Sequence, residues 1–145
     1  ADAPSKESVM LERSIQKGIS DVIAQAKAYL RTKCLNTDKQ LVCQCCHKEM
    51  PFKLRSNEYY FEAVQCIGDK EKRHFQNRLA LCPTCAAMYQ YARETDDAEI
   101  RRSIVEHEAD DKALAVEIPV RLAGRELTLH FVGTHWFDLK TVLSQ

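Results

Sequence analysis

Apolar residues recur every three or four positions in the N-terminal part of the chain, with charged residues between them. This spacing gathers the apolar side chains on one face and predicts a single amphipathic helix from Ser5 to about Lys33. Gly18 is expected to weaken it by about 1 kcal/mol relative to alanine. We expect the apolar face to pack on the domain core; an oligomerisation helix is the alternative. The face comprises Val9, Leu11, Ile15, Ile19, Val22, Ile23, Ala26 and Leu30.

The pattern changes to short, strand-like segments between residues 41 and 92. The aromatic and β-branched run Glu58–Val64 predicts a strand, and Asn77–Leu81 is expected to complete a hairpin with it. The charged residues from 69 to 74 predict a solvated loop between them. Ala86–Ala92 has helical character, so the hairpin is expected to be followed by a helix.

The stretch from residue 94 to 112 is acidic, and its apolar residues again have helical spacing. Ile100, Ile104 and Val105 lie on one face, which predicts a surface helix beginning near Asp96 or Asp97. Acidic residues in its first turn suit the positive end of the helix dipole. We interpret the acidic run as the solvated face of this helix.

The C-terminal tail predicts a second hairpin and a closing helix. Ala115–Leu122 and Glu126–Val132 alternate as strands do, and Ala123-Gly124 between them suits a tight turn. Pro119 lacks an N–H donor, so the first of these strands is expected to be bulged or to lie at an edge. Trp136 to Leu143 fits a short helix.

Composition limits the class of protein. The 145 residues include 21 basic and 21 acidic side chains and are 45% apolar, enough for a folded core but without the bulk charge of a nucleic-acid binder. No run approaches the roughly 20 apolar residues of a membrane span. The start, Ala-Asp-Ala-Pro-Ser, has neither an initiator Met nor an apolar signal region, so we expect a cytoplasmic piece of a larger protein.

Four of the seven cysteines form two Cys-x-x-Cys pairs, Cys43 with Cys46 and Cys82 with Cys85. Two such pairs provide the four thiolates of a tetrahedral structural zinc site. Cys45 or His47 is an alternative for one ligand. A redox-active Cys-x-x-Cys would need a thioredoxin-like βαβ pattern, which the sequence does not show. The two remaining thiols, Cys34 and Cys66, are expected to behave as small apolar residues.

The segment around these pairs resembles the zinc-bearing branch of the HNH endonuclease family. The resemblance covers about a third of the chain and is carried by Tyr60–Ala63, by Asn77–Cys85, which includes the second cysteine pair, and by Met88. It implies a treble clef in which a knuckle, a hairpin and a helix surround the zinc. In the family, two histidines follow the Glu-Ala-like strand end; one binds the catalytic metal and the other is the general base.

The resemblance also implies that the catalytic residues are missing. The two histidine positions are Val64 and Gln65, and the helix positions that commonly carry histidine are Ala86 and Gln90. Valine and alanine cannot bind a metal, and an amide is too weak a base to deprotonate water. Only the family's asparagine, Asn77, is retained. The expected function is therefore non-catalytic, and a site rebuilt from His74 and Glu62 is the minor alternative.

Three functions remain open. The favoured one is an accessory domain of a larger nucleic-acid-processing or defence protein that binds DNA or RNA. A structural module that contacts other domains or proteins is the alternative, and a diverged metal-dependent nuclease is the second alternative. No small-molecule substrate is indicated. The candidate nucleic-acid contacts, interleaved with acidic residues, are Lys53, Arg55, Lys70, Lys72, Arg73 and Arg78.

The sequence thus predicts an α+β fold, a four-cysteine zinc treble clef with a long N-terminal helix and a C-terminal hairpin and helix. Its expected parts are the amphipathic helix (1–40), the HNH-like zinc core (41–93), the acidic helix and linker (94–113) and the hairpin with its closing helix (114–145). We expect these parts to form one compact domain.

Overall fold

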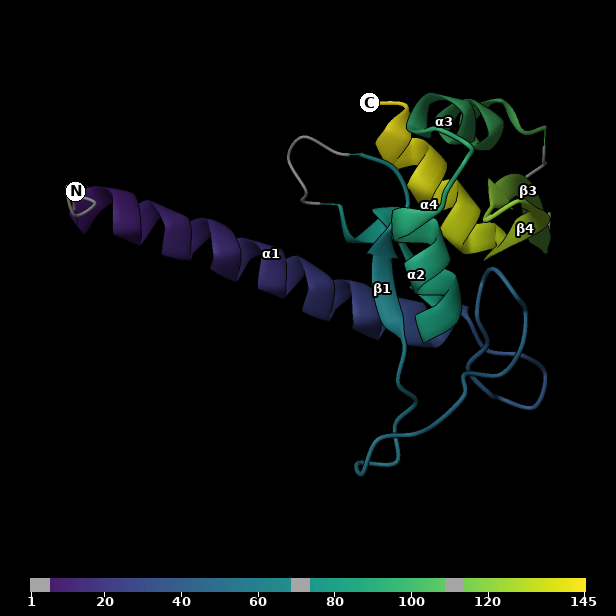
Figure 1. The fold of residues 1–145 in the computed structure, drawn as a ribbon, viewed down its shortest axis with the longest axis horizontal. Helices are drawn as coiled ribbons and strands as arrows, with labels where there is room; N and C mark the ends of the chain where they lie inside the picture. Colours follow the sequence, from purple (N-terminus) through teal and green to yellow (C-terminus); the bar gives the residue numbers. More distant parts are fainter. Residues whose placement is uncertain (1–5, 69–73, 109–113) are drawn as a thin grey trace.

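A computed structural model describes residues 6–68, 74–108 and 114–145, with side chains described from residue 18 onward. The fold is α+β, as predicted: two separate two-stranded antiparallel sheets are combined with helices (Figure 1). The elements in chain order are α1 (Lys6–Lys33), β1 (Glu62–Gln65), the 3₁₀ turn η1 (Phe75–Asn77), β2 (Arg78–Leu81), α2 (Pro83–Tyr91), α3 (Asp97–Glu106), β3 (Ala115–Leu122), β4 (Arg125–Val132) and α4 (Gly133–Leu143).

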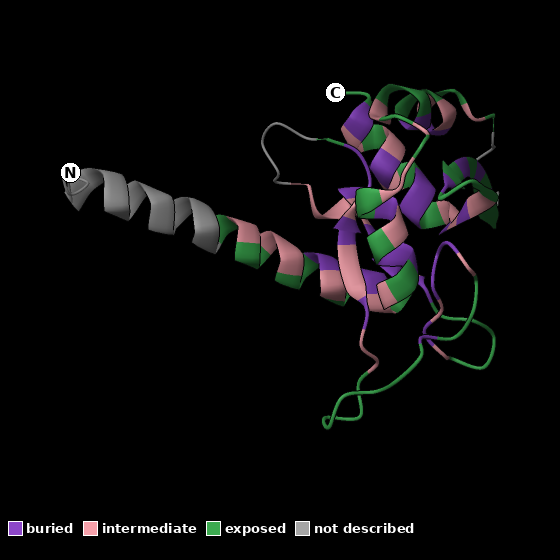
Figure 2. Ribbon diagram, in the orientation of Figure 1, coloured by how far each residue is buried: buried purple, intermediate pink, exposed green. Residues whose placement is uncertain are grey.

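Helix α1 projects from the rest of the molecule, and only its C-terminal end reaches the core (Figure 1). Ala26 and Leu30 are fully buried there. Ile19, Val22 and Ile23, one to two turns earlier, are only half-buried (Figure 2). The prediction that the apolar face packs on the domain core is therefore confirmed for the end of the helix. In the described turns before it, the apolar side chains stay partly exposed to solvent.

The first hairpin is shorter than the sequence suggested. Strand β1 pairs with β2 from Glu62↔Leu81 to Gln65↔Arg78. The residues from 51 to 60, part of which were predicted as strand, instead form a separate projecting arm. In this arm, a bridge joins Lys53 to Tyr59, and the Leu54 N–H donates to the Glu58 carbonyl at 2.7 Å. The chain therefore closes one small hairpin before it begins β1.

The second hairpin follows the prediction closely. Strands β3 and β4 pair over their full lengths, and the turn between them places Ala123 (φ 49°) and Gly124 (φ 74°) in the left-handed region that a tight hairpin turn needs. Alternate β3 residues are buried, from Val116 to Leu122. Helices α3 and α4 both contact this hairpin. In the described chain, β3 forms a two-stranded sheet with β4, and Pro119 is one of its exposed residues. The missing N–H of this proline therefore costs no hydrogen bond between strands.

The helices that follow the hairpins begin near the predicted residues. Asp96 caps α3, its carboxylate accepting the Glu99 N–H at 2.8 Å, as the acidic start of that helix suggested. Helix α2 starts three residues earlier than expected, at Pro83, whose fixed φ suits a first helical position. Helix α4 extends the predicted closing helix back to Gly133.

One continuous core joins both halves of the described chain. The buried residues of α1, the first hairpin, α2, α3, the second hairpin and α4 form a single apolar cluster (Figure 2). The edge of β4 is covered by the segment after Val42, because the His130 N–H donates to the Gln44 carbonyl at 2.8 Å. The C-terminal hairpin is thus fixed directly to the segment that carries the first cysteine pair.

Candidate metal centre

The structure brings the four predicted cysteine ligands together. Cys43 and Cys46 lie in the turn that follows Val42, whereas Cys82 and Cys85 lie at the start of α2. Their sulfur atoms are all within 4.8 Å of one another. Four sulfurs around one tetrahedral ion, each about 2.3 Å from it, would lie about 3.8 Å apart, so the cluster is of the right size for a single metal ion.

The first pair is held by a tight turn. The Cys43 N–H donates to the Lys48 carbonyl at 2.9 Å, and the His47 N–H donates back to the Cys43 carbonyl at 3.0 Å. His47 takes a left-handed conformation (φ 63°), which reverses the chain just after Cys46. The turn therefore directs both sulfurs of the pair toward the same side.

The second pair is held by the N-terminus of α2. Cys82 is the residue that caps this helix, and its sulfur accepts the Cys85 N–H at 3.5 Å. Pro83 occupies the first helical position without loss of a hydrogen bond. The start of the helix also carries partial positive charge, which favours thiolates at this place.

The surroundings of Cys43 suit a thiolate bound to a cation. Its sulfur accepts the N–H groups of Cys45 and Cys82, both at 3.4 Å. Such N–H donors orient metal-bound thiolates and offset part of their charge. A hydrogen bond with the Cys85 thiol, together with burial, holds the pKa of Cys43 above its ordinary value. A divalent cation would displace these protons, and this donor set of four soft sulfurs fits one.

The two alternative ligands are not part of the mutually close group of four. Cys45 is buried and its thiol lies beside that of Cys85, but the four sulfurs that all approach one another are those of the two predicted pairs. The His47 Nε2 lies 3.0 Å from the Thr128 carbonyl, which can only accept, so this nitrogen carries a proton and binds the second hairpin. In the described part of the chain, the four cysteines are the only group of three or more potential ligand residues that could hold a metal ion. His74 and Glu62 therefore form no such group there.

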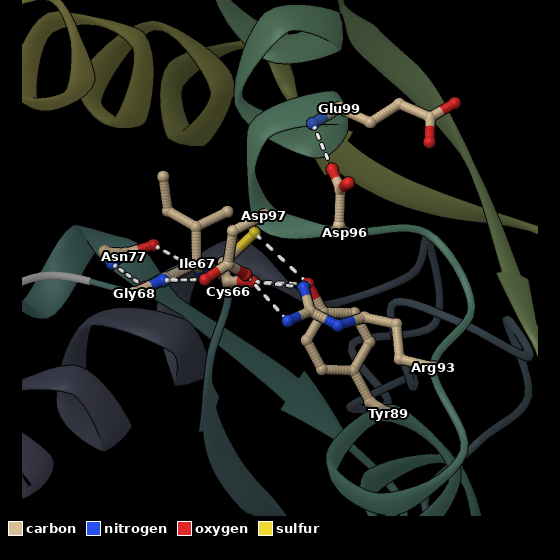
Figure 3. Close-up of polar contacts among 9 residues, drawn as sticks. All are labelled: Cys66, Ile67, Gly68, Asn77, Tyr89, Arg93, Asp96, Asp97 and Glu99. Carbon is tan, nitrogen blue, oxygen red and sulfur yellow. Dashed lines mark hydrogen bonds and ion pairs between the residues drawn. The ribbon is translucent and has the colours of Figure 1, made fainter.

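The positions at which the resemblance to HNH nucleases leads one to expect histidines are mostly packed into the protein. Val64 and Ala86 are buried core residues, Gln65 is half-buried on β1, and Gln90 is exposed on α2. Asn77 is buried and binds one backbone residue with both ends of its amide (Figure 3). Its Oδ1 accepts the Ile67 N–H at 3.2 Å, and its Nδ2 donates to the Ile67 carbonyl at 2.8 Å.

Hydrogen bonds and an ion pair connect the residues that follow β1 to helices α2 and α3 (Figure 3). The Cys66 carbonyl accepts hydrogen bonds from the Tyr89 hydroxyl and, at 3.3 Å, from Arg93. Arg93 also forms an ion pair with Asp97 at 2.6 Å, and the Gly68 N–H donates to the same carboxylate at 2.9 Å. Each of these side chains binds a backbone group or another side chain, so together they hold the chain after β1 in place.

The candidate nucleic-acid contacts are distributed unevenly. Lys53 and Arg55 are both exposed on the arm (51–60). Arg78 is half-buried on β2 and donates to the Ala63 carbonyl at 3.1 Å, which gives it a structural role. The other three, Lys70, Lys72 and Arg73, lie outside the described residues.

Sequence reasoning missed two buried polar residues beside the cysteine cluster. The Gln44 Oε1 accepts the Ala80 N–H at 2.8 Å, and its Nε2 donates to the His130 carbonyl at 2.9 Å. The same Nε2 lies 3.4 Å from Nδ1 of His135, whose Nε2 binds the Gln76 carbonyl at 3.0 Å. Burial lowers the pKa of His135 to about 4. Neither residue belongs to a sequence pattern that marks it, apart from its apolar and cysteine neighbours.

Comparison with known proteins identifies no relative. The chain matches no protein-family model, no curated protein and no solved structure. In the described residues, no helix is both long and apolar enough to cross a membrane. The cysteine cluster and the surface around it are therefore the features that can indicate a function.

Proposed function

We propose that this chain is a non-catalytic zinc-binding domain whose four cysteines hold one structural zinc in an HNH-like treble clef. The approach of four sulfurs within 4.8 Å of one another carries the proposal. The order of elements supports it: a turn with the first pair precedes the β1–β2 hairpin, and α2 carries the second pair in its first turn. Four thiolates with no open position are the donor set of structural zinc sites.

The non-catalytic assignment follows from what replaces the missing histidines. Val64 and Ala86 contribute to the apolar core, where neither side chain can bind a metal or move a proton. Asn77 holds the Ile67 backbone with both ends of its amide, so a structural role accounts for it. We expect no cleavage of DNA or RNA with magnesium, manganese, nickel or zinc; metal-dependent cleavage lost in a His74→Ala variant would contradict the assignment.

We further propose that the domain binds nucleic acid as a cytoplasmic accessory part of a larger nucleic-acid-processing or defence protein. The support is the arm (51–60), where Lys53 and Arg55 are exposed to solvent. A reducing compartment suits seven cysteines without a disulfide. Binding isotherms on labelled DNA and RNA at about 50 mM salt test this, because phosphate contacts make affinity fall steeply as salt rises. Absent binding, or binding insensitive to salt, would contradict the proposal.

A protein-interaction module is the second candidate, and one observation favours it. Ile19, Val22 and Ile23 on α1 remain half-exposed within the described chain. Pull-down with the remaining domains of the parent protein tests this function. Capture lost in an Ile23→Asp variant, with nucleic-acid binding absent, would favour it over the first.

A further inference from the structure

The arm (51–60) is a small ordered hairpin that projects from the body below β1 (Figure 1). The Leu54 N–H donates to the Glu58 carbonyl, and the Asn57 N–H donates to the Leu54 carbonyl at 2.9 Å. The Tyr60 N–H closes its base by donating to the Phe52 carbonyl at 3.1 Å. Its side chains are therefore held by a bonded backbone, which lowers the entropy cost of binding.

An aromatic pair lies at the base of the arm. The rings of Phe52 and Tyr60 stack with centroids 5.1 Å apart and planes inclined by only 7°. Phe52 nevertheless remains 50% exposed. Tyr60 thus supports the Phe52 ring on one side, and a large part of its surface stays open to solvent.

Two basic residues lie on the same arm as this ring, and two nearby carboxylates already have partners. The Lys53 ammonium lies 4.8 Å from the centroid of the Tyr59 ring. Arg55 has no hydrogen bond or ion pair within the described chain. Of the nearest acidic residues, Glu49 accepts the Tyr59 hydroxyl and Glu58 pairs with Arg31 of α1 at 3.4 Å. The arm therefore offers positive charge together with an exposed aromatic ring.

We propose that the arm binds single-stranded nucleic acid by stacking a base on Phe52, while Arg55 and Lys53 contact the flanking phosphates. This rests on the proposed nucleic-acid function and specifies its ligand. Stacking requires an open base face, which a single strand offers and the interior of a duplex does not. The charge complementarity selects a polyanion over an apolar protein surface, because an apolar partner would have to desolvate Arg55 without a counter-charge.

Fluorescence anisotropy with a labelled single strand, and with the duplex of the same sequence, tests the proposal at several salt concentrations. We expect tighter binding of the single strand and at least about fivefold weaker binding by Phe52→Ala, the lower end of the range found for loss of one base–aromatic stack. Phe137→Ala is the matched control because Phe137, on α4, is 54% exposed. Arg55→Ala should weaken binding and reduce its salt dependence. Arg125→Ala, at an exposed site on β4, should change neither.

A 2-aminopurine in the single strand reports stacking directly, and we expect its fluorescence to be quenched by the wild-type protein but not by Phe52→Ala. Zinc content and circular dichroism should be unchanged in each variant, since Phe52 and Arg55 lie outside the cysteine cluster. Single-strand binding unaffected by Phe52→Ala, or binding of duplex alone, would overturn the arm proposal and leave the nucleic-acid function standing. Failure to bind any nucleic acid would overturn both.

Discussion

Replacement of Gln44 by alanine is the sharpest test of how the cysteine-bearing turn is joined to the rest of the fold. Gln44 is almost fully buried, and its amide connects three elements. Its Oε1 accepts the Ala80 N–H of β2, and its Nε2 contacts the His130 carbonyl of β4 and Nδ1 of His135 on α4. Alanine removes all of these contacts, while the backbone bonds of residue 44 can persist.

The expected cost follows from the partners left behind. Each buried donor or acceptor without a partner costs about 1–3 kcal/mol. The Ala80 N–H and the His130 carbonyl have hydrogen bonds of 2.8 and 2.9 Å to lose, whereas the 3.4 Å contact with His135 is weaker. We therefore expect the free energy of unfolding to fall by about 3–5 kcal/mol. This is a large fraction of the stability of an ordinary domain.

Urea denaturation of the zinc-loaded protein at pH 7.5, followed by circular dichroism, measures this loss. Gln90→Ala is the matched control because Gln90 is exposed on α2, and it should change stability by less than about 0.5 kcal/mol. Zinc stoichiometry should stay the same in both variants, since no ligand is altered. If Gln44→Ala lost less than about 1 kcal/mol, the inference that this amide joins the two hairpins would be wrong.

Three further predictions address other parts of the structure. Cys82→Ser should abolish stoichiometric zinc binding, measured by elemental analysis, whereas Cys34→Ser, a buried thiol outside the cluster, should retain it. Gly68→Ala should destabilise the domain by about 1 kcal/mol because its Cβ would lie 2.9 Å from a carboxylate oxygen, whereas Gly18→Ala, with open space, should raise helicity. His135 stays neutral in the folded state, so its contribution should be complete above about pH 6.5 and be lost as pH falls toward about 4. Urea titrations should show that His135→Gln flattens this pH dependence, and an unchanged slope would refute the assignment.

Much of the fold could be predicted because it depends on local patterns. The strict alternation of Ala115–Leu122 and the left-handed pair Ala123-Gly124 define the second hairpin from sequence alone. The spacing of the cysteine pairs likewise predicted the residues that meet at the candidate metal centre. In both cases the signal lies in residues close together in the chain, where geometry is set by backbone preferences.

The parts that could not be predicted depend on contacts between distant segments. The aromatic run Glu58–Val64 has strand propensity throughout, yet its first half pairs with residues 53 and 54 in the arm rather than continuing β1. In the sequence, Gln44 is one of two residues between the ligands of the first cysteine pair. Its buried hydrogen bonds form only because β4 packs against it. The sequence also could not show how much of α1 reaches the core. Helical periodicity shows which face of the helix is apolar, but not how far along the helix the core extends.

Zinc K-edge X-ray absorption measures the ligands of the bound metal and so tests the four-cysteine site itself. We expect four sulfur neighbours at about 2.3 Å and no oxygen or nitrogen bound to the metal. A first shell with a nitrogen or oxygen ligand would contradict the four-cysteine assignment, because the metal would then be bound by a residue outside the two pairs or would keep an open position for water.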